Sequence, residues 1–349
     1  MSDPQRVLFL ADAGPTVGGG HVMRCLTLAR ALTSRGAECA FVESRAAAPI
    51  LRRFGWPQQT LLALVATENL SDLLQYAGDF AGRFEPDIVV TDHYGVDGSH
   101  ETALAWAGQR RVVAIDDLAD RPHNCDLVVD PGYGRKADAY AGLVAARTRV
   151  LAGPSYALVR PEFASARQRA MSRRAKHGRI GRALVSLGLT DVGAVTGRVV
   201  QALQPMLGDV RLDVVIGAGT PSIEALSALA ASDRRIHLWI DTAEMASLMA
   251  DCDIAIGAGG SSVWERATVG LPSATVILAE NQRPMIERMA AMGFTLALDV
   301  AAGDFEAQLA QAWQVLIADT PTRWRLAEAS SELCDGQGAE RVAEAVLGL

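Results

Sequence analysis

Short apolar runs alternate with stretches of helical periodicity along almost the whole chain of 349 residues. Short apolar runs bounded by turn residues are typical of buried strands, and apolar residues spaced three or four apart are typical of helices that pack on a sheet. In the first half this pattern predicts helices over residues 21–35, 70–84 and 99–108, and strands at residues 7–11, 40–42, 87–91, 112–116 and 127–129. Because strands and helices alternate, we expect parallel strands joined by right-handed crossovers.

The same pattern restarts in the second half, with strands predicted at residues 183–187, 212–216, 237–240, 253–256 and 274–278. We therefore predict an α/β protein with two doubly wound, Rossmann-like domains that face a cleft. The predicted boundaries are residues 1–162 for the first domain, 163–182 for a linker and 183–349 for the second domain. The last predicted helix, residues 340–347, is compatible with packing on either domain, including back on the first.

The predicted linker is strongly basic and has little apolar content. Its charged residues include Arg167, Arg169, Arg173, Arg174, Lys176, Arg179 and Arg182. Such a run is typical of a solvated linker or surface helix. The alternative is a basic rim beside a cleft that binds an anion.

Composition excludes several classes of protein. The chain is 50% hydrophobic, which excludes disorder as its main state, and its net charge of -7 argues against nucleic-acid binding. No run approaches the roughly 18 uninterrupted apolar residues of a membrane span. The five cysteines form no CxxC pair, and the first residues contain no apolar signal stretch. We therefore expect a cytoplasmic monomer that acts on a small molecule and needs no metal or cofactor.

A glycine-rich loop, residues 12–20, follows the first predicted strand. Gly18, Gly19 and Gly20 let the backbone approach a ligand closely, and the helix N-terminus after them favours an anion. His21 in the first helical turn is expected to point at the cleft, with a pKa lowered by the helix N-terminus, as a general base requires. The alternative is a surface histidine that caps a turn. Nicotinamide binding is disfavoured, because Met23 occupies the third glycine position of the GxGxxG fingerprint.

A second candidate loop, residues 257–262, follows the predicted strand 253–256. The backbone amides of Gly260, Ser261 and Ser262, with the two hydroxyls, are suited to holding a diphosphate. Glu265 follows one turn later, where it can accept hydrogen bonds from ribose hydroxyls. The alternative is a capped helix with an exposed glutamate.

Other polar residues follow further predicted strands. Asn281 and Gln282 offer neutral amides to sugar or phosphate oxygens, and Asp92-His93-Tyr94 offers an imidazole and a phenol. Asp116 and Asp117 are interpreted as capping and loop hydrogen-bond residues, because adjacent carboxylates in an extended chain point to opposite sides. No HExxH or GxSxG motif occurs.

Several sequence blocks occur in a fixed order between residues 7 and 283: GGGHVMRCLTLA at 18–29, IDDLADR at 115–121 followed by Cys125-Asp126, GPSYALVRPEF at 153–163, GGSSVWE at 259–265, and Asn281-Gln282. In these blocks and their order, the chain resembles the PseG family, the UDP-2,4-diacetamido-2,4,6-trideoxy-β-L-altropyranose hydrolases of pseudaminic acid biosynthesis. The pattern differs at Leu10, where the family has arginine, and at Leu189, where it has a second glycine.

The resemblance implies a GT-B-like architecture related to the MurG glycosyltransferases, with UDP held mainly by the C-terminal domain. It implies that His21 acts on the attacking water and that Tyr94 and Asn281 take part in catalysis and line the sugar site. Asp12, Gly19 and Gly20 would also face the sugar. UDP would contact Gly188, Thr190, Gly259, Gly260, Ser261, Ser262, Glu265 and Gln282.

The predicted function is therefore metal-independent hydrolysis of this UDP-sugar at its anomeric carbon, with C–O cleavage. The resemblance places this step in pseudaminic acid biosynthesis for surface or flagellin glycosylation. The alternatives are a GT-B glycosyltransferase that uses a UDP-amino sugar as donor in the same cleft, and a nucleotide-sugar sensor without turnover.

Overall fold

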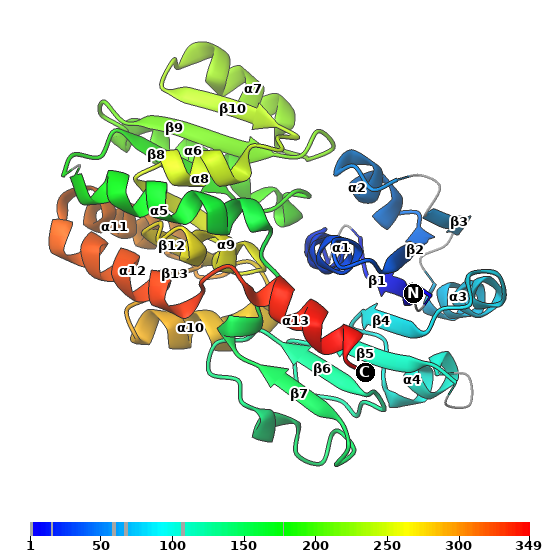
Figure 1. Cartoon of the computed structure of the whole chain (residues 1–349). Helices are drawn as coiled ribbons and strands as arrows, with labels where there is room; N and C mark the ends of the chain where they lie inside the picture. Colours follow the sequence, from blue (N-terminus) through cyan, green and yellow to red (C-terminus); the bar gives the residue numbers. More distant parts are fainter. Residues whose placement is uncertain (1–2, 15–16, 58–60, 66–68, 106–108, 177) are drawn as a thin grey trace. The chain divides into compact units, whose positions relative to one another are not determined.

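The computed structural model describes residues 3–14, 17–57, 61–65, 69–105, 109–176 and 178–349. The chain divides into two compact units (Figure 1). The first unit comprises residues 1–158 together with 337–349, and the second comprises residues 159–336. The second unit therefore begins a few residues before the predicted boundary at 162, and the end of the chain belongs to the first unit.

The first unit is built on a parallel seven-stranded sheet with the order β3-β2-β1-β4-β5-β6-β7. Its strands are β1 (Arg6–Ala11), β2 (Glu38–Ser44), β3 (Leu61–Val65), β4 (Ile88–Asp92), β5 (Arg111–Ile115), β6 (Leu127–Asp130) and β7 (Arg149–Ala152). Its helices are α1 (Gly20–Thr33), α2 (Ala47–Arg53), α3 (Leu70–Phe84), α4 (Gly98–Leu104), α13 (Gly338–Leu347) and the short 3-10 helices η2 (Ala137–Tyr140) and η3 (Pro154–Tyr156). Successive β1 side chains enter opposite cores: Val7 and Phe9 pack in the core that contains α1 and α13, and Leu8 and Leu10 in the core that contains α3.

The second unit is built on a parallel six-stranded sheet with the order β10-β9-β8-β11-β12-β13. Its strands are β8 (Arg182–Ser186), β9 (Arg211–Ile216), β10 (Ile236–Ile240), β11 (Ile254–Ala258), β12 (Ser273–Ile277) and β13 (Leu296–Asp299). Its helices are α5 (Pro161–Lys176), α6 (Val195–Leu203), α7 (Ile223–Ser232), α8 (Met245–Asp251), α9 (Ser262–Thr268), α10 (Arg283–Ala291), α11 (Phe305–Ala318), α12 (Thr320–Leu333) and the 3-10 helices η4 (Val192–Ala194), η5 (Gln204–Met206) and η6 (Glu280–Gln282).

The predicted fold class, two doubly wound parallel α/β sheets, is confirmed. Every predicted strand overlaps a strand of the structure, whereas β3, β7 and β13 were not predicted. The predicted helix over residues 99–108 ends at Leu104 in the structure, and residues 106–108 lie outside the described residues. In both sheets the strand order reverses at an internal pair, β1 beside β4 and β8 beside β11. Ligands of such sheets bind beyond the carboxyl ends of the strands at this reversal.

Helix α13 packs on the first unit, close to α1 (Figure 1). Val342 and Val346 are fully buried in the core that contains α1. At its first residue, Gly338, a Cβ atom would overlap the backbone of Ala157. Glycine therefore lets the start of α13 approach the preceding chain more closely than any other residue would.

The basic segment 163–182, predicted as a linker, is instead an integral part of the second unit: most of it forms α5, which packs along α8 (Figure 1). Three of its arginines, Arg167, Arg173 and Arg174, donate to carbonyl groups at or just after the ends of other helices. Arg174 donates to carbonyls of Met249, Ala250 and Cys252 at the end of α8, and to Val269 after α9. Arg167 donates to Thr268 and to Ser331, at the ends of α9 and α12. These guanidinium groups stabilise the helix C-termini, because helix C-termini present unpaired carbonyls and the negative end of the helix dipole.

A buried network in the first unit surrounds Asp116, which follows β5. Its carboxylate accepts hydrogen bonds from Arg121, Tyr140 and the backbone N–H of Ala119. His123 lies between this carboxylate and Glu101, with Nδ1 2.7 Å from Glu101 Oε1 and Nε2 3.8 Å from Asp116 Oδ2. Burial alone would lower the pKa of His123, but the two carboxylates raise it to about 9. Asp116 therefore makes the loop hydrogen bonds that the sequence predicts, to Ala119 and Arg121, whereas no helix cap is formed by it within the described ranges.

Replacing Arg174 with methionine is expected to lower the free energy of unfolding by about 2–4 kcal/mol, because several buried carbonyls lose their donor. Arg179 is the matched control from the same basic segment, since Arg179 and its partner Asp209 are both largely exposed to solvent. Arg179→Ala should change the free energy of unfolding by less than about 0.5 kcal/mol. Urea denaturation of the two variants measures both values, and equal effects would contradict the capping role.

The His123 network predicts a loss of stability in mild alkali. A pKa raised from the ordinary 6.5 to about 9 stabilises the fold fully below pH 6.5, and this stabilisation is lost as the pH rises through 9. The loss is at most roughly 3 kcal/mol. Urea denaturation between pH 6 and pH 10 should show it in the native protein and not in His123→Gln. A native protein equally stable across this range would contradict the prediction.

Candidate functional site

In the first unit, the glycine-rich loop connects β1 to α1 at the point where the strand order reverses. Gly18 donates its N–H to the carbonyl of Gly14, 2.8 Å away, and residues 15–16 between them lie outside the described residues. The φ angle of Gly18 is 83°, a backbone region that favours glycine. Gly19 is the N-cap residue and Gly20 the first residue of α1, so His21 is held in the first turn. His21 is 6% exposed.

The carboxylate of Asp92 binds three residues of the first turns of α1. Asp92 is the last residue of β4 and is fully buried. His21 Nδ1 lies 2.5 Å from Asp92 Oδ1. Arg24 donates from Nε to Oδ2 and from Nη2 to Oδ1, both at 2.6 Å, and the thiol of Cys25 lies 3.6 Å from Oδ2. The two loops are also joined through the backbone, because Asp12 donates its N–H to the carbonyl of Asp92.

This arrangement fixes the charge of Asp92 and the tautomer of His21. Burial favours the neutral acid, but Arg24 and His21 hold the pKa of Asp92 well below its usual range. Nδ1 of His21 lies closer to Asp92 Oδ1, at 2.5 Å, than to Nη2 of Arg24, at 3.1 Å. An ionised carboxylate can only accept, so the shorter contact assigns the ring hydrogen to Nδ1. In the neutral ring the lone pair is then on the other nitrogen, Nε2, which has no hydrogen-bond partner among the described residues.

Tyr94 contacts this histidine, and Asp117 and Asp12 contact the neighbouring Arg24 and His93, respectively. The ring of Tyr94 meets that of His21 edge-on, with centroids 4.6 Å apart. Burial, followed by the charge of Asp117, raises the pKa of Tyr94, so the phenol stays protonated. Asp117 accepts a hydrogen bond from Arg24 Nη1 at 2.7 Å. Asp12 Oδ1 lies 3.7 Å from Nε2 of His93, whose pKa is lowered chiefly by burial.

Arg24 was not singled out by the sequence analysis, and Asp92 was noted only for its place at a strand end. One local signal was present: Arg24 stands three residues after His21, so both side chains lie on one face of a helix. Asp117, interpreted as a loop hydrogen-bond residue, instead pairs with Arg24.

In the second unit, the loop 259–261 connects β11 to α9 at the other reversal of strand order. Gly259 donates its N–H to the carbonyl of Val276. A Cβ at this position would lie 2.9 Å from Oε1 of Gln282, which accepts a hydrogen bond from the N–H of Leu278. Gln282 is thus packed against the glycine loop. The hydroxyls of Ser261 and Ser262 donate to no acceptor in the part of the chain that the structure describes.

Glu265 lies one turn into α9 and is held by an arginine. Arg160 donates from Nε and Nη2 to the same oxygen, Oε1, at 3.1 and 2.9 Å. Arg160 also stacks over the ring of Phe163, with Cζ 4.9 Å from the ring centroid. Oε2 of Glu265 accepts no hydrogen bond from the described residues. One oxygen of this carboxylate is therefore anchored while the other can accept from a ligand.

The other predicted residues of this unit follow β8 and β12. Gly188 has φ 110°, and half-buried Thr190 precedes the buried Asp191. Asp191 accepts hydrogen bonds from the N–H and hydroxyl of Thr196 through Oδ1. Asn281 lies in η6 and is exposed. The predicted residues of each unit therefore follow strands at or next to the reversal of order.

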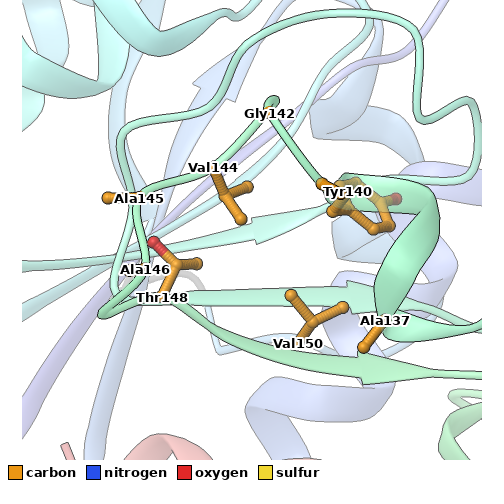
Figure 2. A pocket seen from close by; sticks show the side chains of 9 residues that line it. Ala137, Tyr140, Gly142, Val144, Ala145, Ala146, Thr148 and Val150 are labelled. Carbon is orange, nitrogen blue, oxygen red and sulfur yellow. The ribbon is translucent and has the colours of Figure 1, made fainter.

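A hollow of about 430 Å³ lies beside β7 and contains none of the predicted site residues (Figure 2). Small and apolar side chains predominate among its lining residues, Ala137, Tyr140, Ala141, Gly142, Val144, Ala145, Ala146, Thr148 and Val150. Within the described ranges, no three His, Cys, Asp or Glu side chains are grouped as a metal ion would need. Nor does any described helix have the length and apolar character to cross a membrane.

Two named proteins are similar in sequence to this chain over most of its length. A UDP-2,4-diacetamido-2,4,6-trideoxy-β-L-altropyranose hydrolase of Campylobacter jejuni is 25% identical over 289 residues, which cover 83% of this chain and 97% of the hydrolase. The spore coat polysaccharide biosynthesis protein SpsG of Bacillus subtilis is 25% identical over 345 residues, covering 96% of this chain and 95% of that protein. No family model matches the chain.

Solved structures share the fold at low sequence identity. MurG of Acinetobacter baumannii superposes with a TM-score of 0.67 at 16% identity, covering 99% of this chain and 100% of MurG. A UDP-GlcNAc 2-epimerase of Neisseria meningitidis, solved with UDP-GlcNAc bound, has a TM-score of 0.68 at 12% identity, and 99% of each chain is covered. The chain thus has the MurG-like, GT-B-like fold and the similarity to the altropyranose hydrolase that its sequence motifs predict.

Proposed function

We propose that this protein is an enzyme acting on UDP-sugars, and specifically that it hydrolyses UDP-2,4-diacetamido-2,4,6-trideoxy-β-L-altropyranose to UDP and the free sugar. The observation that carries the proposal is the geometry of His21, whose Nδ1 is bound to an ionised, buried Asp92 and whose Nε2 has no hydrogen-bond partner among the described residues. The choice of sugar rests on the similarity to the Campylobacter jejuni hydrolase and on the shared sequence blocks.

The His21–Asp92 pair suits a general base. An imidazole with its hydrogen on Nδ1 can take a proton at Nε2, and the carboxylate behind it stabilises the imidazolium that forms. Arg24 keeps Asp92 ionised and in place through two hydrogen bonds. Such a base contributes on the order of 10²–10⁴ to the rate.

The proposed reaction is a substitution at the anomeric carbon. The water oxygen forms a bond to C1 while the bond from C1 to the diphosphate oxygen breaks, and its electron pair leaves with UDP. Nε2 of His21 takes a proton from the water and later releases it to solvent. UDP is a good leaving group, so we propose that hydrogen-bond donors suffice to stabilise it and that no metal is needed.

The UDP is proposed to bind the second unit. Ser261 and Ser262 have hydroxyls available for the diphosphate, and Oε2 of Glu265 is available for the ribose hydroxyls. Asn281 and Gln282, with Gly188 and Thr190, are proposed to complete the contacts to sugar and phosphate. In this scheme Tyr94 and Asp12 of the first unit bind the sugar beside His21, and the product enters pseudaminic acid biosynthesis.

His21→Ala is expected to lower kcat at least about 100-fold and to leave UDP affinity unchanged, because the base acts on water and not on the nucleotide. Asp92→Asn should also lower kcat, because the amide no longer fixes the Nδ1 tautomer. UDP release from the purified protein with EDTA, followed by NMR in ¹⁸O water, measures the rate and shows whether the label enters the sugar.

His100 provides the control, since it also pairs with an aspartate of the first unit, Asp97, but at the start of α4. His100→Ala should turn over within twofold of the native protein. Near-native turnover by His21→Ala would overturn the role of the base. Label in UDP would mean P–O cleavage, and turnover only with an added acceptor would indicate the glycosyltransferase alternative.

Glu265→Gln is expected to reduce the preference for UDP over 2′-deoxy-UDP. If Oε2 accepts from the ribose, the native protein binds UDP about 10-fold or more tightly than the deoxy analogue, because a charged acceptor strengthens the hydrogen bond. The variant should bind the two ligands within about threefold of each other. Calorimetric titration measures both affinities, and an unchanged preference would place the ribose elsewhere.

A further inference from the structure

The guanidinium of Arg266 is buried beneath the loop 259–261 without an acidic acceptor. Arg266 lies on α9 and is 2% exposed. It donates to the carbonyl of Ala258 at 2.9 Å, and to the hydroxyls of Ser262, Thr275 and Ser273 at 3.1, 3.1 and 3.4 Å. All four acceptors are neutral. Burial lowers the pKa of Arg266 to about 10, so the group still carries its charge at neutral pH.

The sheet is shaped around this side chain. A Cβ atom at Gly257, on β11, would overlap the guanidinium. Glycine at this position therefore leaves the space that the guanidinium fills at the carboxyl end of the strand. Burying the Arg266 guanidinium costs desolvation free energy, and it also requires glycine at position 257. A compensating favourable interaction of the buried charge is therefore expected.

The hydroxyls that receive the guanidinium differ in one respect. Thr295 donates to the carbonyl of Ser273, so the hydroxyl of Thr275, 2.7 Å away, donates to Thr295 and is fully paired. The hydroxyls of Ser262 and Ser273 accept from Arg266, and neither has an acceptor for its own hydrogen among the described residues. Ser273 is buried, whereas Ser262 is half-buried at the start of α9, where a ligand can reach it. Ser262 is therefore held as a donor, and its hydrogen is polarised by the cation behind its oxygen.

The described carboxylates near this position are not hydrogen-bonded to Arg266. Glu265 is paired with Arg160, whose charge also interacts with Glu162. The guanidinium of Arg266 therefore has no carboxylate acceptor of its own among the described residues, which favours an anion at the loop.

We propose that Arg266 is a positioning residue for the ligand's diphosphate, which it serves by orienting the Ser262 hydroxyl as a donor and by supplying buried positive charge. This inference rests on the proposed function, because it requires UDP at the loop. The guanidinium acts through Ser262 and through its electrostatic potential. It is therefore expected to affect the diphosphate and not the nucleoside.

The test compares UDP with uridine by NMR or calorimetric titration. Arg266→Met should weaken UDP binding roughly 10- to 100-fold and leave uridine binding within twofold, as expected for the loss of a charge-assisted contact. Ser262→Ala should weaken UDP alone, and adding it to Arg266→Met should cause little further loss. Arg211→Met is the matched control: it removes one positive charge at the start of β9, where Arg211 pairs with Asp213, and should leave both affinities unchanged.

The outcomes distinguish a failure of the proposed function from a failure of the role of Arg266 alone. Native protein that binds no UDP overturns the proposed function and this inference together. Native protein that binds UDP, with an unchanged UDP-to-uridine ratio in Arg266→Met, overturns only the role of Arg266. If Arg266→Met does not fold, Ser262→Ala decides: unchanged UDP affinity in this variant overturns the role, and a loss confined to UDP supports it.

Discussion

Both sheets wind outward from an internal pair of parallel strands, β1 with β4 and β8 with β11. At such a reversal the connections leave toward opposite faces, so the loops after the two strands diverge and leave space that no crossover helix fills. The residues able to carry chemistry gather there in each unit. In the first unit, His21 lies on the helix that follows β1, and Asp92 ends β4. In the second unit, Gly188 follows β8 and the loop 259–261 follows β11. Strand order, more than any local motif, decides where the candidate sites lie.

In the first unit, the site and the stability of the fold depend on the same buried carboxylate. A charge as deeply buried as that of Asp92 is tolerated only when it is paired and hydrogen-bonded, and Arg24 and His21 provide both. Because Arg24 belongs to α1 and Asp92 to β4, this pair also fixes the helix against the sheet. The orientation of the His21 imidazole is therefore set by an interaction that the fold itself requires.

The sequence was sufficient to predict the strands around both reversals, because their apolar runs are long and end in glycine or acidic residues. The short strand β7 is likewise followed by Gly153 and β13 ends at Asp299, but each contributes an apolar run of only three residues with at most one β-branched side chain, which is too weak to indicate a strand. The role of α5 was not predictable, because the carbonyls that Arg167 and Arg174 bind lie 75 to 167 positions away in sequence. Arg24 and Asp92 are likewise 68 positions apart, so only the spacing of His21 and Arg24 on one helix face was visible locally.

Two buried arginines of the second unit, Arg174 and Arg266, show that a guanidinium with only neutral acceptors can have two different roles. Burial lowers the pKa of both Arg174 and Arg266 to about 10, and both donate only to neutral groups. Arg174 faces carbonyls at the ends of α8 and α9, where helix dipoles supply partial negative charge. Arg266 has a single carbonyl and three hydroxyls, and the half-buried hydroxyl of Ser262 has no acceptor for its hydrogen among the described residues. The charge of Arg174 is thus offset within the fold, whereas that of Arg266 is left for a ligand to offset.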